Sequence, residues 1–191
     1  LLRKGNKVWI SKSNNPHRKL KYTLEIIEEN SSKVGVNTHS ANKIIKEALY
    51  HNLIKEITNI REIKAESKFG TYTRFEFLII GKKYKAYMEV KNVTLSRKKG
   101  IAEFPDAITS RGLKHINELI KASKKNYKIY ILYLIQRNDC KNFTIAKDID
   151  FKYAKALHKA VKNKLKILCY DCKFSSKGIK LNKQIKFTIN D

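Results

Sequence analysis

The stretch TYTRFEFLIIGKKYKAYMEVKNVTL, from Thr71 to Leu95, decides the fold. Residues 71–80 and 84–95 are rich in aromatic and β-branched side chains, which favour strands. The connection between them, residues 81–83, is only long enough for a turn, and strands joined by so short a turn pair in the antiparallel sense. The stretch therefore predicts an antiparallel hairpin.

The segment before the hairpin adds one strand and one helix. Residues 61–69 alternate between apolar or small and charged side chains, as a third strand of the same meander would. A short helix over residues 53–57 is an option. Further upstream, apolar residues recur at helical spacing, with Ser40 placed as the cap: Ala41, Ile44, Ile45, Ala48 and Leu49.

After the hairpin, the sequence predicts helices and strands in alternation. A loop is expected over residues 96–105 and a helix over residues 110–123. Residues 128–136 are apolar at nearly every position, which is typical of a central strand buried on both faces. The remaining expected elements are a helix over 151–164 and strands over 7–11, 22–28, 33–37, 166–174 and 178–187. This order predicts a mixed α/β (α+β) fold.

Composition restricts the class of protein. The chain has 191 residues, 42% of them hydrophobic and 10% aromatic, which is a globular composition and excludes disorder throughout. The longest apolar run, residues 129–135, is too short to cross a bilayer, and no signal-type segment opens the chain. We expect a soluble, cytoplasmic protein that has no membrane partner.

The charge predicts a polyanionic partner. There are 42 Lys and Arg residues against 17 Asp and Glu, which gives a net charge of +25. A surface this positive attracts nucleic acid, because each neutralised phosphate releases a counterion. The alternative is a surface of ordinary solvated lysines, since Lys outnumbers Arg fivefold.

Common catalytic motifs are missing from the sequence. It contains no P-loop, no G-x-G-x-x-G and no G-x-S-x-G. Cys169 and Cys172 form one C-x-x-C, but no second pair exists, so we expect buried thiols and no zinc site.

Two acidic residues within apolar strands are better candidates for chemistry. Glu76 and Glu89 lie in the two halves of the hairpin, and Lys91 shares a strand face with Glu89. Two carboxylates with a backbone carbonyl and water suit Mg²⁺ or Mn²⁺, and they should repel each other until such an ion binds. Lysine could then orient an attacking water. The alternative is a simple Glu89–Lys91 ion pair, because the E-x-K string also occurs at Glu62 and Glu66.

Longer motifs identify a family. The strings TRFEF (Thr73–Phe77), MEVKNVTL (Met88–Leu95) and FPDAITSRGLKH (Phe104–His115) resemble the sugar fermentation stimulation protein A family, as do shorter strings near Val36 and Trp9. The similarity covers nearly the whole chain. It implies non-specific DNA binding and a proposed role as a regulator of sugar (maltose) metabolism.

The resemblance also implies two domains. A partial OB-like β domain would occupy residues 1–38, with three strands where an OB barrel has five. A PD-(D/E)xK nuclease-like αβββαβ domain would occupy residues 39–191. The sequence departs from the family at Glu76, where the family usually has Asp.

Site residues follow from the same resemblance. The catalytic set would be Glu47, Glu76, Glu89 and Lys91, of which Glu76 and Glu89 would bind the metal. Residues expected to contact DNA are Trp9, Arg97, Lys98, Lys99, Asp106, Arg111, Lys114 and His115, with residues 97–99 forming a basic loop. Residues 97–99 are chosen for their position on a basic loop after the third strand, and their plainer alternative is a solvated loop. The plainer alternative is a solvated helix acid for Glu47, a core residue for Trp9 and helix packing for His115.

Three functions remain open from the sequence. The first is a non-specific DNA-binding protein, and the second is a Mg²⁺- or Mn²⁺-dependent deoxyribonuclease. The third is a transcriptional or RNA-associated accessory protein without chemistry. No base-reading motif is visible, and a homodimer remains an option.

Overall fold

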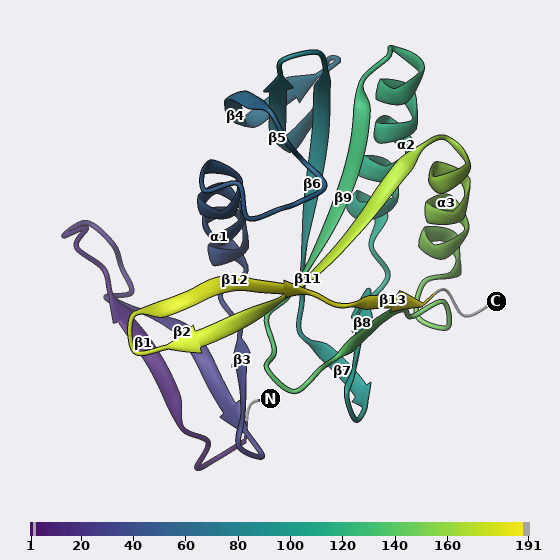
Figure 1. The fold of residues 1–191 in the computed structure, drawn as a ribbon. Helices are drawn as coiled ribbons and strands as arrows, with labels where there is room; N and C mark the ends of the chain where they lie inside the picture. The colour runs from purple at the N-terminus through teal and green to yellow at the C-terminus, as the bar shows by residue number, and fades with distance from the viewer. Residues whose placement is uncertain (2, 189–191) are drawn as a thin grey trace.

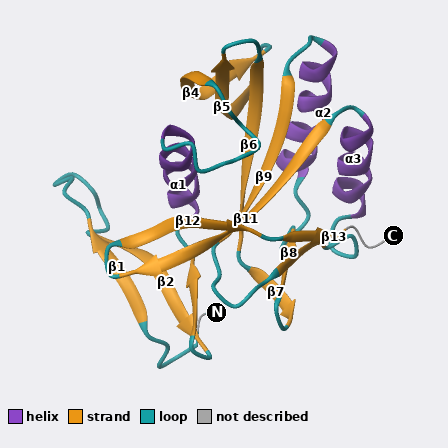
Figure 2. Cartoon of the chain, viewed as in Figure 1, coloured by secondary structure: helices purple, strands orange, loops and turns teal. Residues whose placement is uncertain are grey.

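The computed structural model describes residue 1 and residues 3–188 as three sheets and three helices (Figure 1, Figure 2). The largest sheet has six strands in the order β12-β11-β9-β6-β5-β4. Its strands are β4 (Ile60–Phe69), β5 (Thr73–Gly81), β6 (Lys85–Val93), β9 (Lys128–Ile135), β11 (Leu165–Ser175) and β12 (Gly178–Gln184). The mixed α/β fold expected from the sequence is confirmed.

The hairpin that decides the fold is β5 paired with β6. Antiparallel pairing runs from β4 through β5 to β6, whereas β6, β9 and β11 are parallel. Parallel neighbours need long crossovers, and helices supply them. The crossover from β6 to β9 contains α2 (Ser110–Lys124), and the one from β9 to β11 contains α3 (Phe151–Lys162).

Helices cover both faces of the six-stranded sheet (Figure 1). Helix α1 (Thr38–Tyr50) packs its apolar stripe on one face, and α2 and α3 pack on the other. Strand β9 lies between these two layers and is buried from Ile129 onward, with Leu132 in one cluster and Ile131 in the other. This explains why its sequence shows no polar face.

Two smaller sheets complete the chain. The first joins β1 (Val8–Lys12), β2 (Tyr22–Glu29) and β3 (Ser32–Gly35), which are the three strands expected before the first helix. The second joins β7 (Leu95–Lys98), β8 (Ile101–Phe104), β10 (Asn142–Ile145) and β13 (Lys186–Thr188). No helix among the described residues is long and apolar enough to span a membrane.

Several local expectations were wrong. Helix α1 is capped by Asn37, whose side chain accepts from the His39 N–H, so Ser40 lies inside the first turn. Residues 53–57 form a turn and no helix. Residues 96–105 hold most of the β7–β8 hairpin where a loop was expected, and strand β10 was not anticipated because its four residues carry too short a pattern.

Candidate functional site

A cleft of about 450 Å³ opens between α1, the β4–β5–β6 sheet and the start of α2. We call it the carboxylate cleft, and its lining residues are Thr38, His39, Ala41, Asn42, Glu66, Glu76, Glu89, Val90, Lys91, Asn92 and Arg111. Four of these, Glu76, Glu89, Lys91 and Arg111, were singled out from the sequence. The structure therefore brings together the residues on which the sequence argument depended.

Strand register explains why the two acids meet. The β5–β6 ladder ends at the Phe77–Met88 pair, and Glu76 and Glu89 are the next residue on each strand. Both carboxylates lie where the ladder stops, and there Glu76 contacts Asn42 on α1 while Glu89 contacts His115 on α2. Lys91 is two residues beyond Glu89 on β6 and shares its face.

Glu89 is the most buried acid of the cleft, with 1% of its surface exposed. Its Oε1 accepts hydrogen bonds from Lys91 Nζ at 2.7 Å and from His115 Nδ1 at 2.5 Å. Burial opposes ionisation, but the hydrogen bonds and charges of His115 and Lys91 outweigh it and lower the pKa of Glu89. Glu89 Oε2 is buried and has no hydrogen-bond partner among the described residues.

The pKa of Glu76 is shifted in the opposite direction. Burial, followed by the negative charges of Glu89 and Glu66, raises the pKa of Glu76 from 4.5 to about 7. The side chain of Asn42, on α1, donates to its Oε2 and only partly offsets this rise.

Repulsion between Glu76 and Glu89 is therefore smaller than expected from the sequence alone. Near neutral pH, Glu89 is ionised and paired with Lys91, while a large fraction of Glu76 is protonated. The folded chain relieves the repulsion with a proton on Glu76 and with the Lys91 ammonium beside Glu89.

Glu66 is a cleft residue that the sequence argument did not select. It lies on β4 between Ala65 and Ser67, which pair with Phe77 and Phe75, so it is opposite Glu76. Its φ is +50°, a left-handed conformation that non-glycine residues adopt rarely and usually as isolated residues. The sequence does contain an E-x-K string at Glu66-Ser67-Lys68. The same string occurs elsewhere in the chain by chance, so it did not distinguish Glu66.

Glu47 does not join the carboxylate cleft, which corrects its assignment to the catalytic set. It is exposed on α1, and its Oε1 pairs with Lys180 Nζ at 3.0 Å. At about 100° per residue, position 47 is roughly 140° around the helix from Asn42, which does contact Glu76. The helix contributes an amide to the cleft in place of the expected carboxylate.

The residues predicted around the start of α2 divide into three kinds. Arg111 is exposed and lines the cleft, where it can reach a bound anion. Asp106 is exposed in the loop before α2, and Lys114 is exposed with its Nζ donating to the Tyr72 carbonyl at 3.2 Å. His115 is 6% exposed and lies behind Glu89, so a direct DNA contact is wrong for it and it positions Glu89 instead.

The expected basic loop at residues 97–99 is a hairpin with a fixed arginine. Arg97 donates to Glu103 through Nε at 3.0 Å and Nη2 at 2.7 Å, and to Asp148 through Nη1 and Nη2. Because these acids take up its donors, Arg97 is a structural residue and not a free phosphate ligand. Lys98 and Lys99 remain exposed at the turn.

Trp9 lies on β1, outside the carboxylate cleft, and is half-buried. The ammonium groups of Lys7 and Lys33 stand over its ring at 5.1 and 4.9 Å from the centroid. Its role in DNA binding stays a prediction.

The donor set of the carboxylate cleft is small. Within residues 1 and 3–188, no three His, Cys, Asp or Glu side chains lie close enough to bind an ion between them. An ion at Glu76 and Glu89 would therefore complete its shell with backbone oxygen and water. The three cysteines are buried free thiols, as expected.

Comparison with known proteins gives the same family over both parts of the chain. The family model described as "Sugar fermentation stimulation protein RE domain" matches residues 39–178, and the "SfsA N-terminal OB domain" matches residues 1–36. A sugar fermentation stimulation protein homolog of Pelagibacter ubique is 53% identical over 186 residues, which are 97% of this chain and 80% of the relative. A homolog from Brucella anthropi is 40% identical over 92% of this chain and 76% of its own length.

The fold is similar to that of a solved relative. The chain superposes on SfsA of Pyrococcus furiosus, solved in complex with Ca²⁺, with a TM-score of 0.87 and 24% sequence identity. The match covers 95% of this chain and 78% of that one.

Proposed function

The chain belongs to the sugar fermentation stimulation protein family, and from this premise we propose that it binds DNA without sequence preference and holds a divalent cation in the carboxylate cleft. Such binding would serve the regulation of sugar metabolism that the resemblance to this family implies. The observation that carries the proposal is Glu89 Oε2, a buried carboxylate oxygen without a partner, at the wall of an open cleft. An orphaned buried oxygen is costly unless a ligand completes it.

The donor chemistry fits Mg²⁺ or Mn²⁺. Glu89 Oε2 and the Glu76 carboxylate are hard oxygen donors, which these ions prefer, and Asn42 holds Glu76 toward the cleft. The relative from Pyrococcus furiosus was solved with Ca²⁺, another ion that binds oxygen. Binding would displace the proton from Glu76, so affinity should rise with pH up to about 7.

The charge supports DNA as the partner. The net charge is +25, and the carboxylate cleft is flanked by exposed Arg111 and contains Lys91. These cations can contact phosphate oxygens beside the bound ion, whose charge would offset that of the two acids. We find no helix-turn-helix in the described residues, which favours recognition of the backbone over the bases.

A second candidate function is a Mg²⁺- or Mn²⁺-dependent deoxyribonuclease. The observation that favours it is the contact of Lys91 Nζ with Glu89 Oε1 at 2.7 Å, which fixes the ammonium at the cleft. A bound cation would supply Lewis acidity toward a phosphodiester. Glu89 would orient Lys91, and Lys91 would donate a hydrogen bond to a water or phosphate oxygen in the cleft.

The test of the first function is fluorescence anisotropy on several unrelated duplexes, with and without Mn²⁺, at increasing salt. We expect similar affinities for all sequences, tighter binding with Mn²⁺, and a steep fall with salt. A strong preference for one duplex, or binding that ignores salt, would contradict the proposal. Cleavage of the same duplexes by wild type but not by Lys91→Met would establish the second function.

A further inference from the structure

We propose that a second cleft, lined by Lys82, Lys83, Lys85 and Lys125, binds the phosphate backbone of DNA outside the carboxylate cleft. We call it the lysine cleft. The inference deepens the proposed function, because it names where on the protein the backbone is held. It does not depend on a metal ion.

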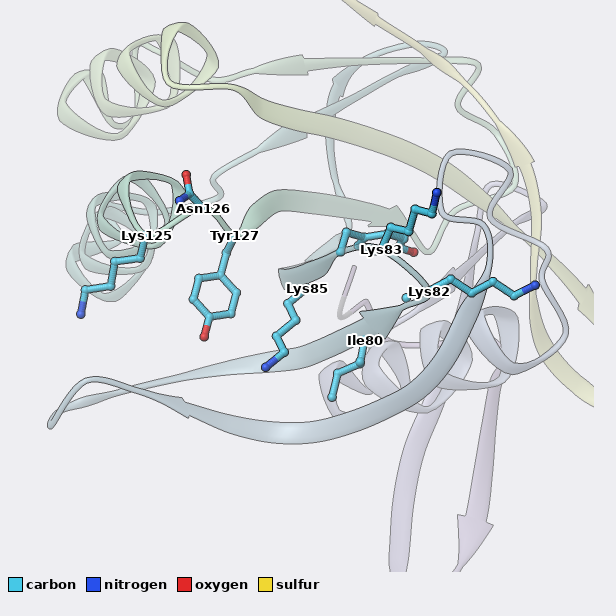
Figure 3. Close-up of a pocket in the computed structure, with 9 residues that line it drawn as sticks. Ile80, Lys82, Lys83, Lys85, Lys125, Asn126 and Tyr127 are labelled. Carbon is cyan, nitrogen blue, oxygen red and sulfur yellow. The ribbon is translucent and has the colours of Figure 1, made fainter.

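The lysine cleft has a volume of about 470 Å³. One wall is the turn between β5 and β6, which carries Lys82 and Lys83, together with Lys85 at the start of β6. The other wall is the turn between α2 and β9, which carries Lys125 and Tyr127. Figure 3 shows the Tyr127 ring between the side chains of Lys85 and Lys125, with Lys82 and Lys83 on the far side of Lys85. The Lys82 and Lys83 side chains extend away from Tyr127 in this view, so an anion beside the ring would meet the ammonium groups of Lys85 and Lys125, one from each wall.

These four lysines lack acidic partners. In the described part of the chain, none of them has a carboxylate oxygen within 4.0 Å, although Lys64, Lys91, Lys121 and Lys180 all do. Like charges in one concave surface repel one another, and a polyanion removes that repulsion and releases its counterions. Lys125 stands over the Phe69 ring, 5.5 Å from its centroid, so its charge has an aromatic contact but no carboxylate to neutralise it. The positive charge of the lysine cleft is therefore not neutralised within the described residues.

The backbone beneath the lysines is fixed, so the charges are not carried by a mobile loop. The Gly81 N–H donates to the Tyr84 carbonyl at 2.8 Å, and Tyr84 Oη donates to the Thr58 carbonyl at 2.8 Å. The Lys82 N–H donates to the Asn59 carbonyl at 3.0 Å, and Lys128 Nζ covers the Tyr84 ring at 4.3 Å. Less ordering is then needed when DNA binds.

Tyr127 adds a rigid phenol to the lysine cleft. Its ring packs on Tyr87, with ring centroids 4.9 Å apart, and edge-on against Phe69 at 6.4 Å. A fixed aromatic ring between two lysines suits a sugar–phosphate chain, because the ring can contact the sugar while the ammonium groups bind adjacent phosphates.

The two clefts are close enough for one duplex to reach both. Ile80 and Lys85 lie four residues along β5 and β6 from Glu76 and Glu89, which is about 13 Å at the rise of a strand. Phosphates on one DNA strand are spaced by about 3.4 Å along the helix axis, so this separation corresponds to about four base pairs.

The test compares two charge-matched variants of the full chain. The first replaces Lys82, Lys83, Lys85 and Lys125 with Gln. The control replaces four exposed lysines of α3 with Gln: Lys152, Lys155, Lys159 and Lys162. Both lower the net charge from +25 to +21, since each removes four positive charges, so the general attraction to DNA falls equally. Thermal melts establish that both variants are folded.

Binding of a duplex of about 16 base pairs is measured by anisotropy over a salt series without metal. The lysine-cleft variant should bind DNA about tenfold more weakly than wild type at 0.1 M salt. The slope of its plot of log affinity against log salt should be smaller in magnitude by about 2 to 3, because each phosphate contact contributes about 0.9 to that slope. The α3 variant should stay within about twofold of wild type. Equal losses in the two variants would overturn the lysine cleft while leaving the proposed function standing. A wild type that binds no duplex would overturn both.

Discussion

Replacing Glu76 with Gln should flatten the dependence of stability on pH. The folded state raises the pKa of Glu76 from 4.5 to about 7, so between these values the folded chain keeps a proton that the unfolded chain has released. The stability contributed by that proton is complete below about pH 4.5 and is lost as the pH rises through about 7. Gln cannot titrate, so Glu76→Gln should show no such loss while still offering Asn42 an acceptor.

The size of the effect follows from the pKa of Glu76. A difference of about 2.5 in pKa corresponds to about 3.4 kcal/mol for a fully buried group. Because Glu76 is only half-buried and solvent in the cleft screens its charge, we expect about 1 to 2 kcal/mol.

Urea denaturation in the presence of EDTA measures this difference. The free energy of unfolding of Glu76→Gln minus that of wild type should increase by about 1 to 2 kcal/mol between pH 5 and pH 8. Two pH profiles that run parallel over this range, or a difference that shrinks with pH, would refute the reasoning about the carboxylate cleft.

Two further substitutions test His115 and Arg97, whose side chains hold buried carboxylates. His115→Ala should destabilise the chain by about 2 to 3 kcal/mol and weaken Mn²⁺ binding, because the buried Glu89 loses the hydrogen bond that positions it. His115→Gln should recover part of the stability and part of the Mn²⁺ affinity. A stable His115→Ala protein with wild-type Mn²⁺ affinity in calorimetry would contradict this. Arg97→Gln should lower the melting temperature, because the buried Glu103 loses its partner, and should leave the DNA affinity at fixed salt nearly unchanged. A large loss of affinity without a change in melting temperature would show that Arg97 contacts DNA.

Patterns of hydrophobic and polar residues were sufficient to predict the main elements. The hairpin of residues 71–95, the stripe of α1 and the apolar run of β9 all carry long, regular signals, and each formed as expected. The strands β7, β8 and β10 were not predicted, because each has only four residues, and β10 pairs with β8 from about 40 positions further along the chain. Such pairing is a tertiary effect that a local pattern does not contain.

The candidate site was predictable to the extent that it follows from strand periodicity. Glu89 and Lys91 are two apart on one strand, so their contact could be derived from the sequence. Glu66 was not selected, because its E-x-K string also occurs elsewhere in the chain and its left-handed backbone conformation departs from regular strand geometry. The pairing of Arg97 with Asp148 joins residues 51 positions apart, and no spacing rule connects them.

The most direct test of the central claim is a crystal grown with Mn²⁺ and examined by anomalous diffraction at the manganese absorption edge. Our account predicts an anomalous peak in the carboxylate cleft, about 2.1 to 2.2 Å from Glu89 Oε2 and within ligand distance of the Glu76 carboxylate. A clear anomalous map without a peak at Glu89, at a pH where Glu76 is ionised, would contradict it.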